Sequence, residues 1–271
     1  MDLLELVEHA KNIRKHAIKM VTNGKASHIG SALSIIDILT TLYFEILAIN
    51  PERPKDPNRD IFILSKGHSS VALYATLAER GYFPMSFLDE FYKDGGKLLG
   101  HSTLGTAPGI EASTGSLGHG LSLGIGMALA SRYDKKKSRV FVLLSDGECD
   151  EGSTWEAIMS AGHYKLNNVI AIIDYNKIQS FGNVKEVMDL EPFSDKWRSF
   201  GWRAEEVDGH NIQQLVNTFS KIPFEGNKPT AIICHTIKGK GISFMENKLE
   251  WHYHSPNEKQ CIDALKELDH K

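Results

Sequence analysis

The chain has 271 residues, enough for one large domain, and its 41% hydrophobic and 24% charged residues are typical of globular proteins. The net charge of -3 argues against a protein that binds nucleic acid or a membrane surface, because both need a concentrated basic face. No apolar run approaches the roughly 18 residues that cross a bilayer. The three cysteines (Cys149, Cys234 and Cys261) are scattered and odd in number, which indicates neither a disulfide framework nor a cysteine zinc site. We expect a cytoplasmic protein.

The first predicted element is an amphipathic helix at about 2–22, where Leu3, Leu6, Ala10, Ile13 and Ala17 recur at three- and four-residue steps. A signal peptide would instead have an uninterrupted apolar core. Further along the chain, continuous apolar runs predict strands at 60–64, 140–144, 169–174 and 230–234. None alternates apolar with polar residues, so these strands should be covered on both faces, as in a parallel sheet.

Helix-like segments lie between and around these strands, at about 33–47, 69–80, 118–131, 153–165, 211–220 and 257–268. The last of them is the predicted C-terminal helix. Strands that alternate with helices over this length predict an α/β fold, with a doubly wound, mostly parallel sheet and helices on both faces. We find no repeat and no long linker, so residues 1–271 are expected to form a single domain.

Polar residues with oxygen side chains end two neighbouring strands of this series. The run "VFVLL" stops at Ser145-Asp146-Gly147, and one helix later "VIAII" stops at Asp-Tyr-Asn, whose last residue is Asn176. In an open parallel sheet, ligands bind beyond the carboxyl ends of the strands, and a right-handed crossover should place these two ends close together. The two side chains suit magnesium or calcium, and Gly147 with the following helix start suits a phosphate. The pattern predicts a metal-bridged diphosphate site.

Taken singly, each of these features is more often a plain turn. The interval from Asp146 to Asn176 spans one β-α-β unit and matches the thiamine-diphosphate motif of Gly-Asp-Gly followed by Asn, with Ser145 in place of the first glycine. From about residue 8 to about 256, the chain also resembles the diphosphate-binding half of transketolase. The resemblance is carried in family order by "ASHIGSALSIIDILTTLYF", "DIFILSKGHSSVALYATLAERGYF", "LGHSTLG", "STGSLGHGLSLGIGMALA" and "IKGKGISFMENKLEWH".

The resemblance implies thiamine diphosphate as cofactor, a divalent metal (Mg²⁺ or Ca²⁺), and a role for specific residues. The implied metal ligands are Asp146, Asn176 and the backbone carbonyl of Ile178. The implied cofactor contacts are Ser31, Lys66, His68, Gly147 and Lys238 near the diphosphate and Gly115, Ser116 and Leu117 along the thiamine rings, together with Asn176 and His252. The implied catalytic residues, facing the ketose, are His28, His101 and His252, and Glu151 and Glu156 resemble glutamates of the family's dimer contact.

Two departures from the family pattern lie where a sugar would approach. Tyr253 and His254 stand where the family has Gly-Lys, and His119 stands where a glutamine is common. The sugar specificity is therefore not fixed by the resemblance.

The same residues also bear on other functions. A zinc hydrolase would use its histidines as metal ligands, but no His-x-x-x-His or Cys-x-x-Cys pair occurs. A nicotinamide dehydrogenase needs an apolar strand before its glycine fingerprint, and none precedes the glycines that begin at Gly115. The remaining alternatives are a 1-deoxyxylulose-5-phosphate synthase-like enzyme and a non-catalytic subunit that keeps the fold.

The family's active site also needs a pyrimidine-binding domain, which supplies the glutamate that activates the cofactor. Residues 1–271 provide no such domain, so we expect a two-chain transketolase that transfers a ketol unit between sugar phosphates. The partner would be a separate C-terminal, pyrimidine-binding subunit, and an α2β2 heterotetramer is the simplest closed assembly. An apolar contact surface is expected around 115–130 and 151–155.

Overall fold

The fold is built on one parallel sheet of five strands in the order β1-β2-β3-β5-β4. We describe it from a computed structural model, in which residues 1–224 and 226–270 are placed. The strands are β1 (Ile61–Leu64), β2 (Val140–Ser145), β3 (Val169–Tyr175), β4 (Arg203–Asp208) and β5 (Thr230–His235). Because β2 and β3 pair in parallel with Ser145 opposite Asp174, their carboxyl ends lie next to each other.

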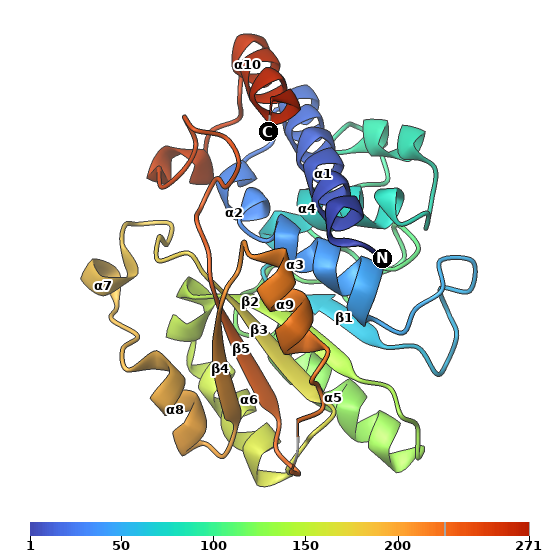
Figure 1. Ribbon diagram of the computed structural model, residues 1–271, viewed down its shortest axis with the longest axis vertical. Helices are drawn as coiled ribbons and strands as arrows, with labels where there is room; N and C mark the ends of the chain where they lie inside the picture. The colour runs from blue at the N-terminus through green and yellow to red at the C-terminus, as the bar shows by residue number, and fades with distance from the viewer. Residues whose placement is uncertain (225, 271) are drawn as a thin grey trace.

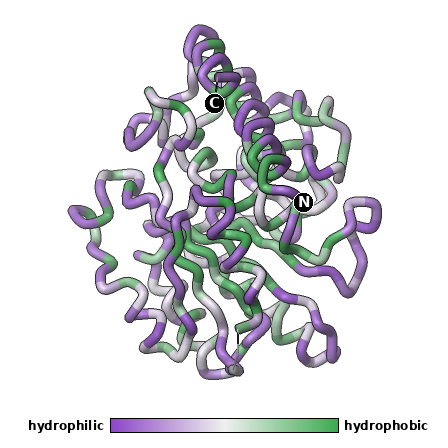
Figure 2. The backbone as a smooth tube through the Cα atoms, in the orientation of Figure 1, coloured by the Kyte–Doolittle hydropathy of each residue, from purple (hydrophilic) through white to green (hydrophobic). Residues whose placement is uncertain are grey.

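Alternate residues of each strand face two separate hydrophobic cores, as the two-residue period of a strand requires. Phe141 and Leu143 of β2 belong to one core, whereas Val142 and Leu144 belong to the other. Both faces are covered by helices, which explains why the three central strands read as unbroken apolar runs. Figure 2 shows the hydrophobic residues concentrated along the strands and the hydrophilic ones toward the outer turns. The expected α/β fold with a parallel sheet is confirmed.

The described helices are α1 (Leu3–Gly24), α2 (Ile29–Leu33), α3 (Ile36–Thr41), α4 (Ser70–Glu79), α5 (Gly120–Tyr133), α6 (Gly152–His163), α7 (Val184–Val187), α8 (Phe193–Ser199), α9 (Ile212–Phe219) and α10 (Glu258–Asp269). α1 begins with a capping box, in which Asp2 and Glu5 each accept the other's backbone N–H. α10 packs along α1 at one end of the molecule (Figure 1). No helix among the described residues is both long and apolar enough to span a membrane.

Three features differ from the sequence-based expectations. The strand β4 was missed because only Ala204 and Val207 are buried in it, among charged residues. The single helix expected at 33–47 is instead α2, α3 and a π-helical turn at Leu42–Ile46, because Ile35 leaves helical geometry at ψ 1°. The short helices α7 and α8 were also not expected.

Candidate functional site

The site is built at the carboxyl ends of β2 and β3, where Asp146 and Asn176 directly follow the strands. The Asp146 carboxylate is held by two backbone donors, the N–H of Gly147 at 2.8 Å and that of Lys177 at 2.6 Å. These bonds connect the two strand ends and fix the direction of the carboxylate. Asp146 is only 2% exposed.

Asn176 is oriented from both ends of its amide. Its Nδ2 donates to Asp174 at 2.9 Å, and its Oδ1 accepts the N–H of Ile178 at 3.1 Å. Asp146, Asn176 and Ile178 all line one small cavity of about 130 Å³. The carboxylate, the amide and the following loop therefore converge, as the spacing of the two motifs predicts.

The electrostatics of this cavity favour a bound cation. Burial, and then the nearby charge of Asp174, raise the pKa of Asp146 to about 6. Both effects disfavour the ionised carboxylate, and a metal ion beside it would offset them and lower the pKa. The raised pKa therefore fits the role of a metal ligand.

Lys238 brings a positive charge to the same cavity. It follows β5 and is 1% exposed, and its Nζ donates to the carbonyl oxygen of Ile178 at 3.0 Å. The same Nζ lies 3.0 Å from Nδ1 of His252. Burial, together with the charge of Lys66, lowers the pKa of Lys238 to about 8, so the group remains mainly cationic at neutral pH.

The imidazoles of His28, His68, His101 and His252 form a cluster above this cavity. Ring centroids are 5.0 Å apart for His28 and His68, and 4.9 Å apart for His28 and His252. His101 completes the group at 6.4 Å from His28. Segments that lie far apart in the sequence are thereby joined at one place.

Three of these histidines, His28, His68 and His252, are held in the neutral form. Burial, followed by the charge of His101, lowers the pKa of His28 to about 4, and burial with the charge of Lys238 lowers that of His252 to about 3. Burial also places the pKa of His68 well below its usual value. Neutral imidazoles can accept or donate a hydrogen bond at physiological pH.

His28 has two features of a strained functional residue. Its backbone is in the left-handed region, at φ 71° and ψ 15°, which is uncommon for a residue other than glycine. Its buried Nδ1 atom has no hydrogen-bond partner among the described residues. Within the described part of the chain, this nitrogen is therefore free of protein partners and can bond to a water molecule or to a ligand group.

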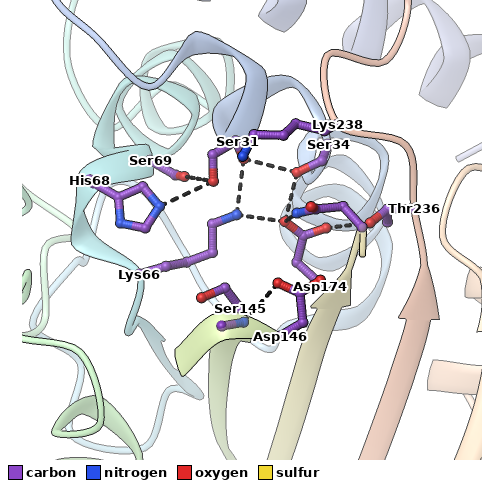
Figure 3. Close-up of polar contacts among 12 residues, drawn as sticks. Ser31, Ser34, Lys66, His68, Ser69, Ser145, Asp146, Asp174, Thr236 and Lys238 are labelled. Carbon is purple, nitrogen blue, oxygen red and sulfur yellow. Dashed lines mark hydrogen bonds and ion pairs between the residues drawn. The ribbon is translucent and has the colours of Figure 1, made fainter. Parts of the chain in front are cut away.

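Beneath the cavity lies a buried ion pair that the sequence reading missed. The Nζ of Lys66 donates to Asp174 Oδ2 at 2.6 Å and to the carbonyl of Ser31 at 3.0 Å (Figure 3). Ser34 and Thr236 also donate to the Asp174 carboxylate. Burial alone would raise the pKa of Asp174, but Lys66 and the hydroxyl donors hold it below its usual value.

This network gives Lys66 a different position from the one expected. Its side chain is fully buried and points to Asp174, and it is absent from the cavity lining. Ser31 and His68 do line the cavity, with Ser31 Oγ 3.1 Å from His68 Nε2. A cofactor contact by Lys66 therefore stays a prediction, whereas a contact with Asp174 is part of the fold.

Glu148 is a second functional candidate that the sequence reading did not single out. It is fully buried, and its carboxylate accepts from the hydroxyl of Ser65 and from the backbone N–H groups of Gly118 and Ser145. One side chain thus fastens together the loops after β1 and β2 and the glycine loop before α5. A buried carboxylate between three loops gives no periodic signal in the sequence.

The glycine loop approaches the histidine cluster at Gly115. This residue has φ 144°, and a Cβ atom built there would lie 2.7 Å from the His101 ring. Ser116 lines a neighbouring open hollow of about 590 Å³, whereas Leu117 lines the small cavity with Asp146. The glycine loop therefore borders both the small cavity and the open hollow.

A larger cleft, of about 690 Å³, lies away from this site, between α1, α10 and the start of α9. Its buried charges are paired with one another, since Asp37 lies 2.5 Å from Arg14 and 2.8 Å from His210. Its charged residues reach the loop after β5 through His210, but Asp146, Asn176 and Ile178 do not line it, and we do not assign the function there.

Comparison with known proteins agrees with the geometry. The family described as "Transketolase, thiamine diphosphate binding domain" matches residues 7–268. The chain is 43% identical to one of the subunits of the apulose-4-phosphate transketolase of Phocaeicola vulgatus, over all of this chain and 95% of that protein. It is 42% identical to the 6-deoxy-6-sulfo-D-fructose transketolase subunit SqwG of a Clostridium species, over 98% of this chain and 97% of that protein.

Solved structures have the same fold. The transketolase of Leishmania mexicana superposes with a TM-score of 0.92 at 27% identity, over 97% of this chain and 41% of that chain. The transketolase of Campylobacter jejuni gives the same TM-score at 28% identity, over 99% of this chain and 43% of that chain. The chain thus spans about two fifths of the length of these solved transketolases.

Proposed function

Since the chain belongs to the transketolase thiamine diphosphate-binding family, we propose that it is the N-terminal subunit of a two-chain transketolase. The reaction is the transfer of a two-carbon ketol unit from a ketose phosphate to an aldose phosphate. The observation that carries the proposal is the convergence of Asp146, Asn176 and Lys238 on one cavity beside a cluster of four imidazoles.

The residues present fit a divalent metal and a diphosphate. Asp146, Asn176 and the carbonyl of Ile178 are oxygen donors of the kind that Mg²⁺ or Ca²⁺ takes, and the raised pKa of Asp146 favours a cation beside it. Lys238 supplies the positive charge that a diphosphate needs, and Gly147 lets the backbone approach it. Ser31, His68 and Leu117 also line the cavity. Ser116, which lines the neighbouring hollow, and Gly115, which lies against His101, are assigned to the thiamine rings.

When bound, thiamine diphosphate supplies the carbanion that attacks the ketose carbonyl. The chain's own contribution is to hold sugar hydroxyls and to move protons. We assign this role to His28, His101 and His252, because their rings lie together and an imidazole can take a proton from a hydroxyl or donate one to an oxygen. The unpartnered Nδ1 of His28 is available for such a bond.

The proposal of a separate partner chain is supported by the relatives rather than by the length of this chain. Two relatives of similar length are named as subunits, and both match this chain over nearly their whole length. Leu123 on α5 is 43% exposed and lines the hollow that the glycine loop borders, and Met159 on α6, which packs against α5, is 55% exposed. We propose this face, with Glu151 and Glu156, as the docking surface, and an α2β2 heterotetramer as the assembly.

Titration calorimetry with thiamine diphosphate tests the binding part of the proposal. We expect binding in the presence of Mg²⁺ and none when the metal is chelated by EDTA, with tighter binding after addition of the pyrimidine-binding chain. Tight binding of the cofactor that is equal with and without a metal would contradict the role given to Asp146 and Asn176.

A further inference from the structure

A short anchored turn brings an aromatic residue to the rim of the histidine cluster. Trp251 is 4% exposed, and its Nε1 donates to the carbonyl of Phe244 at 3.0 Å. The carbonyl of the next residue, His252, accepts the backbone N–H of His28 at 3.0 Å. Tyr253 follows directly, and its own N–H is bonded to the carbonyl of Glu250 at 3.1 Å. Hydrogen bonds therefore hold the backbone before Tyr253 in place beside the histidine cluster.

The Tyr253 ring faces the imidazoles but remains accessible. Its centroid lies 4.8 Å from that of His252 and 6.5 Å from that of His28. The residue is nevertheless 55% exposed, and its hydroxyl has no hydrogen bond to any described residue. The side chain therefore contacts the histidine cluster on one side and solvent on the other.

The neighbouring His254 differs from Tyr253 in the contacts that its ring makes. Its backbone N–H is bonded to the carbonyl of Glu250 at 2.9 Å, so the turn is equally ordered there. Its ring, however, makes no contact with the cluster among the described residues. Of the two residues, Tyr253 is the one that the fold directs at the site.

We propose that Tyr253 is a specificity-determining residue that forms the subsite for the sugar carbons beyond the reacting carbonyl. The inference deepens the proposed function and rests on it. A phenol ring offers an apolar face to the C–H groups of a sugar chain, and its hydroxyl can donate to or accept from a sugar hydroxyl. The imidazoles next to it bind the polar groups nearest the reacting carbonyl. Tyr253 would then contact the sugar carbons further along the chain and so distinguish longer sugars from shorter ones.

The test uses this chain reconstituted with its pyrimidine-binding partner. Acceptor kcat/KM is measured with a short ketol donor for glycolaldehyde and for the phosphates of glyceraldehyde, erythrose and ribose, in the wild type, Tyr253→Phe, Tyr253→Ala and His254→Ala. Loss of one neutral hydrogen bond corresponds to a decrease of about three- to tenfold. We expect Tyr253→Phe to lower kcat/KM by this factor for the longer aldoses but not for glycolaldehyde, and Tyr253→Ala to lower it further.

Two controls separate this role from a structural one. His254→Ala should keep the wild-type order of acceptors, and all variants should bind thiamine diphosphate with unchanged affinity in tryptophan-fluorescence titrations. Equal acceptor preference in wild type and Tyr253→Ala would overturn the inference while leaving the proposed function standing. No transfer by the wild-type pair to any aldose would overturn both.

Discussion

The Nζ atom of Lys238 lies 3.0 Å from Nδ1 of His252 and 3.0 Å from the carbonyl oxygen of Ile178. One buried ammonium thus contacts both the loop proposed to bind the metal and an imidazole proposed to face the sugar. Because Lys238 follows β5 and Ile178 follows β3, two adjacent strands of the sheet hold this arrangement. The Lys238 side chain thus supplies a positive charge for the cofactor and also lowers the pKa of His252.

Replacement of Lys238 by Met should weaken cofactor binding and change His252. Loss of a charged contact to a diphosphate corresponds to an increase in Kd of about tenfold or more, which calorimetry with Mg²⁺ present would measure. The pKa of His252 should rise, because burial and the Lys238 charge are what depress it to about 3. An NMR titration of the imidazole would detect this.

Lys240→Met is the matched control, since Lys240 lies two residues further on, is partly exposed and pairs with Glu246 at 3.8 Å. It should leave both the Kd and the His252 titration unchanged. A cofactor affinity in Lys238→Met that equals that of the control would remove Lys238 from the binding site.

In the absence of metal, Asp146→Asn should remove the loss of stability that accompanies ionisation of Asp146, although the amide keeps only one of the two backbone N–H bonds. The pKa of Asp146 in the fold, about 6, lies above its ordinary value of 3.8. The free energy of unfolding of the wild type should therefore fall by roughly 1–3 kcal/mol as the pH rises from about 4 to about 6. That of the variant should not fall. Urea denaturation with EDTA at pH 4, 5, 6 and 8 measures the difference.

Addition of Mg²⁺ and thiamine diphosphate should raise the Tm of the wild type more than that of Asp146→Asn. A ligand that binds only the folded state raises the Tm, and the variant lacks the carboxylate that holds the metal. Glu151→Gln, an exposed replacement close by, is the control and should follow the wild type. An equal rise in Tm in wild type and Asp146→Asn would count against the metal site.

The buried pair of Lys66 and Asp174 should be strongly coupled. Asp174→Asn leaves the Lys66 ammonium without its charge partner in a fully buried position, which typically destabilises a protein by about 3–5 kcal/mol. In the double variant with Lys66→Met, the loss should be clearly smaller than the sum of the two single losses. Urea denaturation followed by circular dichroism gives the free energies of unfolding.

A surface pair provides the comparison for this cycle. Lys136 and Asp134 lie 2.9 Å apart and are both exposed, so their replacement should have little effect on stability. Additive losses for Lys66 and Asp174 would indicate that the two groups do not depend on each other.

A chain of contacts from α3 should support the loop that carries Lys238. Asp37 accepts from Arg14 at 2.5 Å and lies 2.8 Å from Nδ1 of His210, whose Nε2 accepts the N–H of Ile237 at 2.8 Å. Burial works against ionisation of Asp37, but Arg14 and His210 lower its pKa to about 2. Since this pKa is depressed, the stabilisation is present above pH 4 and is lost as the pH falls toward 2.

Asp37→Asn should remove that acid-sensitive part of the stability and also lower cofactor affinity through the loop. Acid titration followed by tryptophan fluorescence, together with calorimetry, would measure the two effects. An acid transition identical to that of the wild type would show that Asp37 has no part in it.

The sequence predicted a helix or strand wherever the burial of that element alone sets its pattern of apolar residues. The strands β1, β2, β3 and β5 are buried on both faces, so each reads as an apolar run. The edge strand β4 has polar neighbours on its exposed side, and its sequence "RAEEVD" carries no such signal. The break between α2 and α3 also escaped notice, because it depends on the local backbone at Ile35 and not on apolar spacing.

The site could be predicted in part for the same reason. Asp146 and Asn176 directly follow recognisable strands, and the crossover rule indicates that these strand ends are neighbours. Asp174 and Glu148 were missed, because their importance comes from partners far along the chain, such as Lys66 and Ser65. Burial of a carboxylate among distant donors becomes visible only in three dimensions.

The most direct test of the central claim is ketol transfer by the purified chain, measured with and without its pyrimidine-binding partner. The reaction would contain thiamine diphosphate, Mg²⁺, a ketose phosphate and an aldose phosphate, with the products identified by mass spectrometry. We predict no turnover by either chain alone and turnover by the mixture, which Asp146→Asn abolishes. Turnover by this chain alone at the rate of the mixture, with contaminating transketolase excluded, would contradict the account.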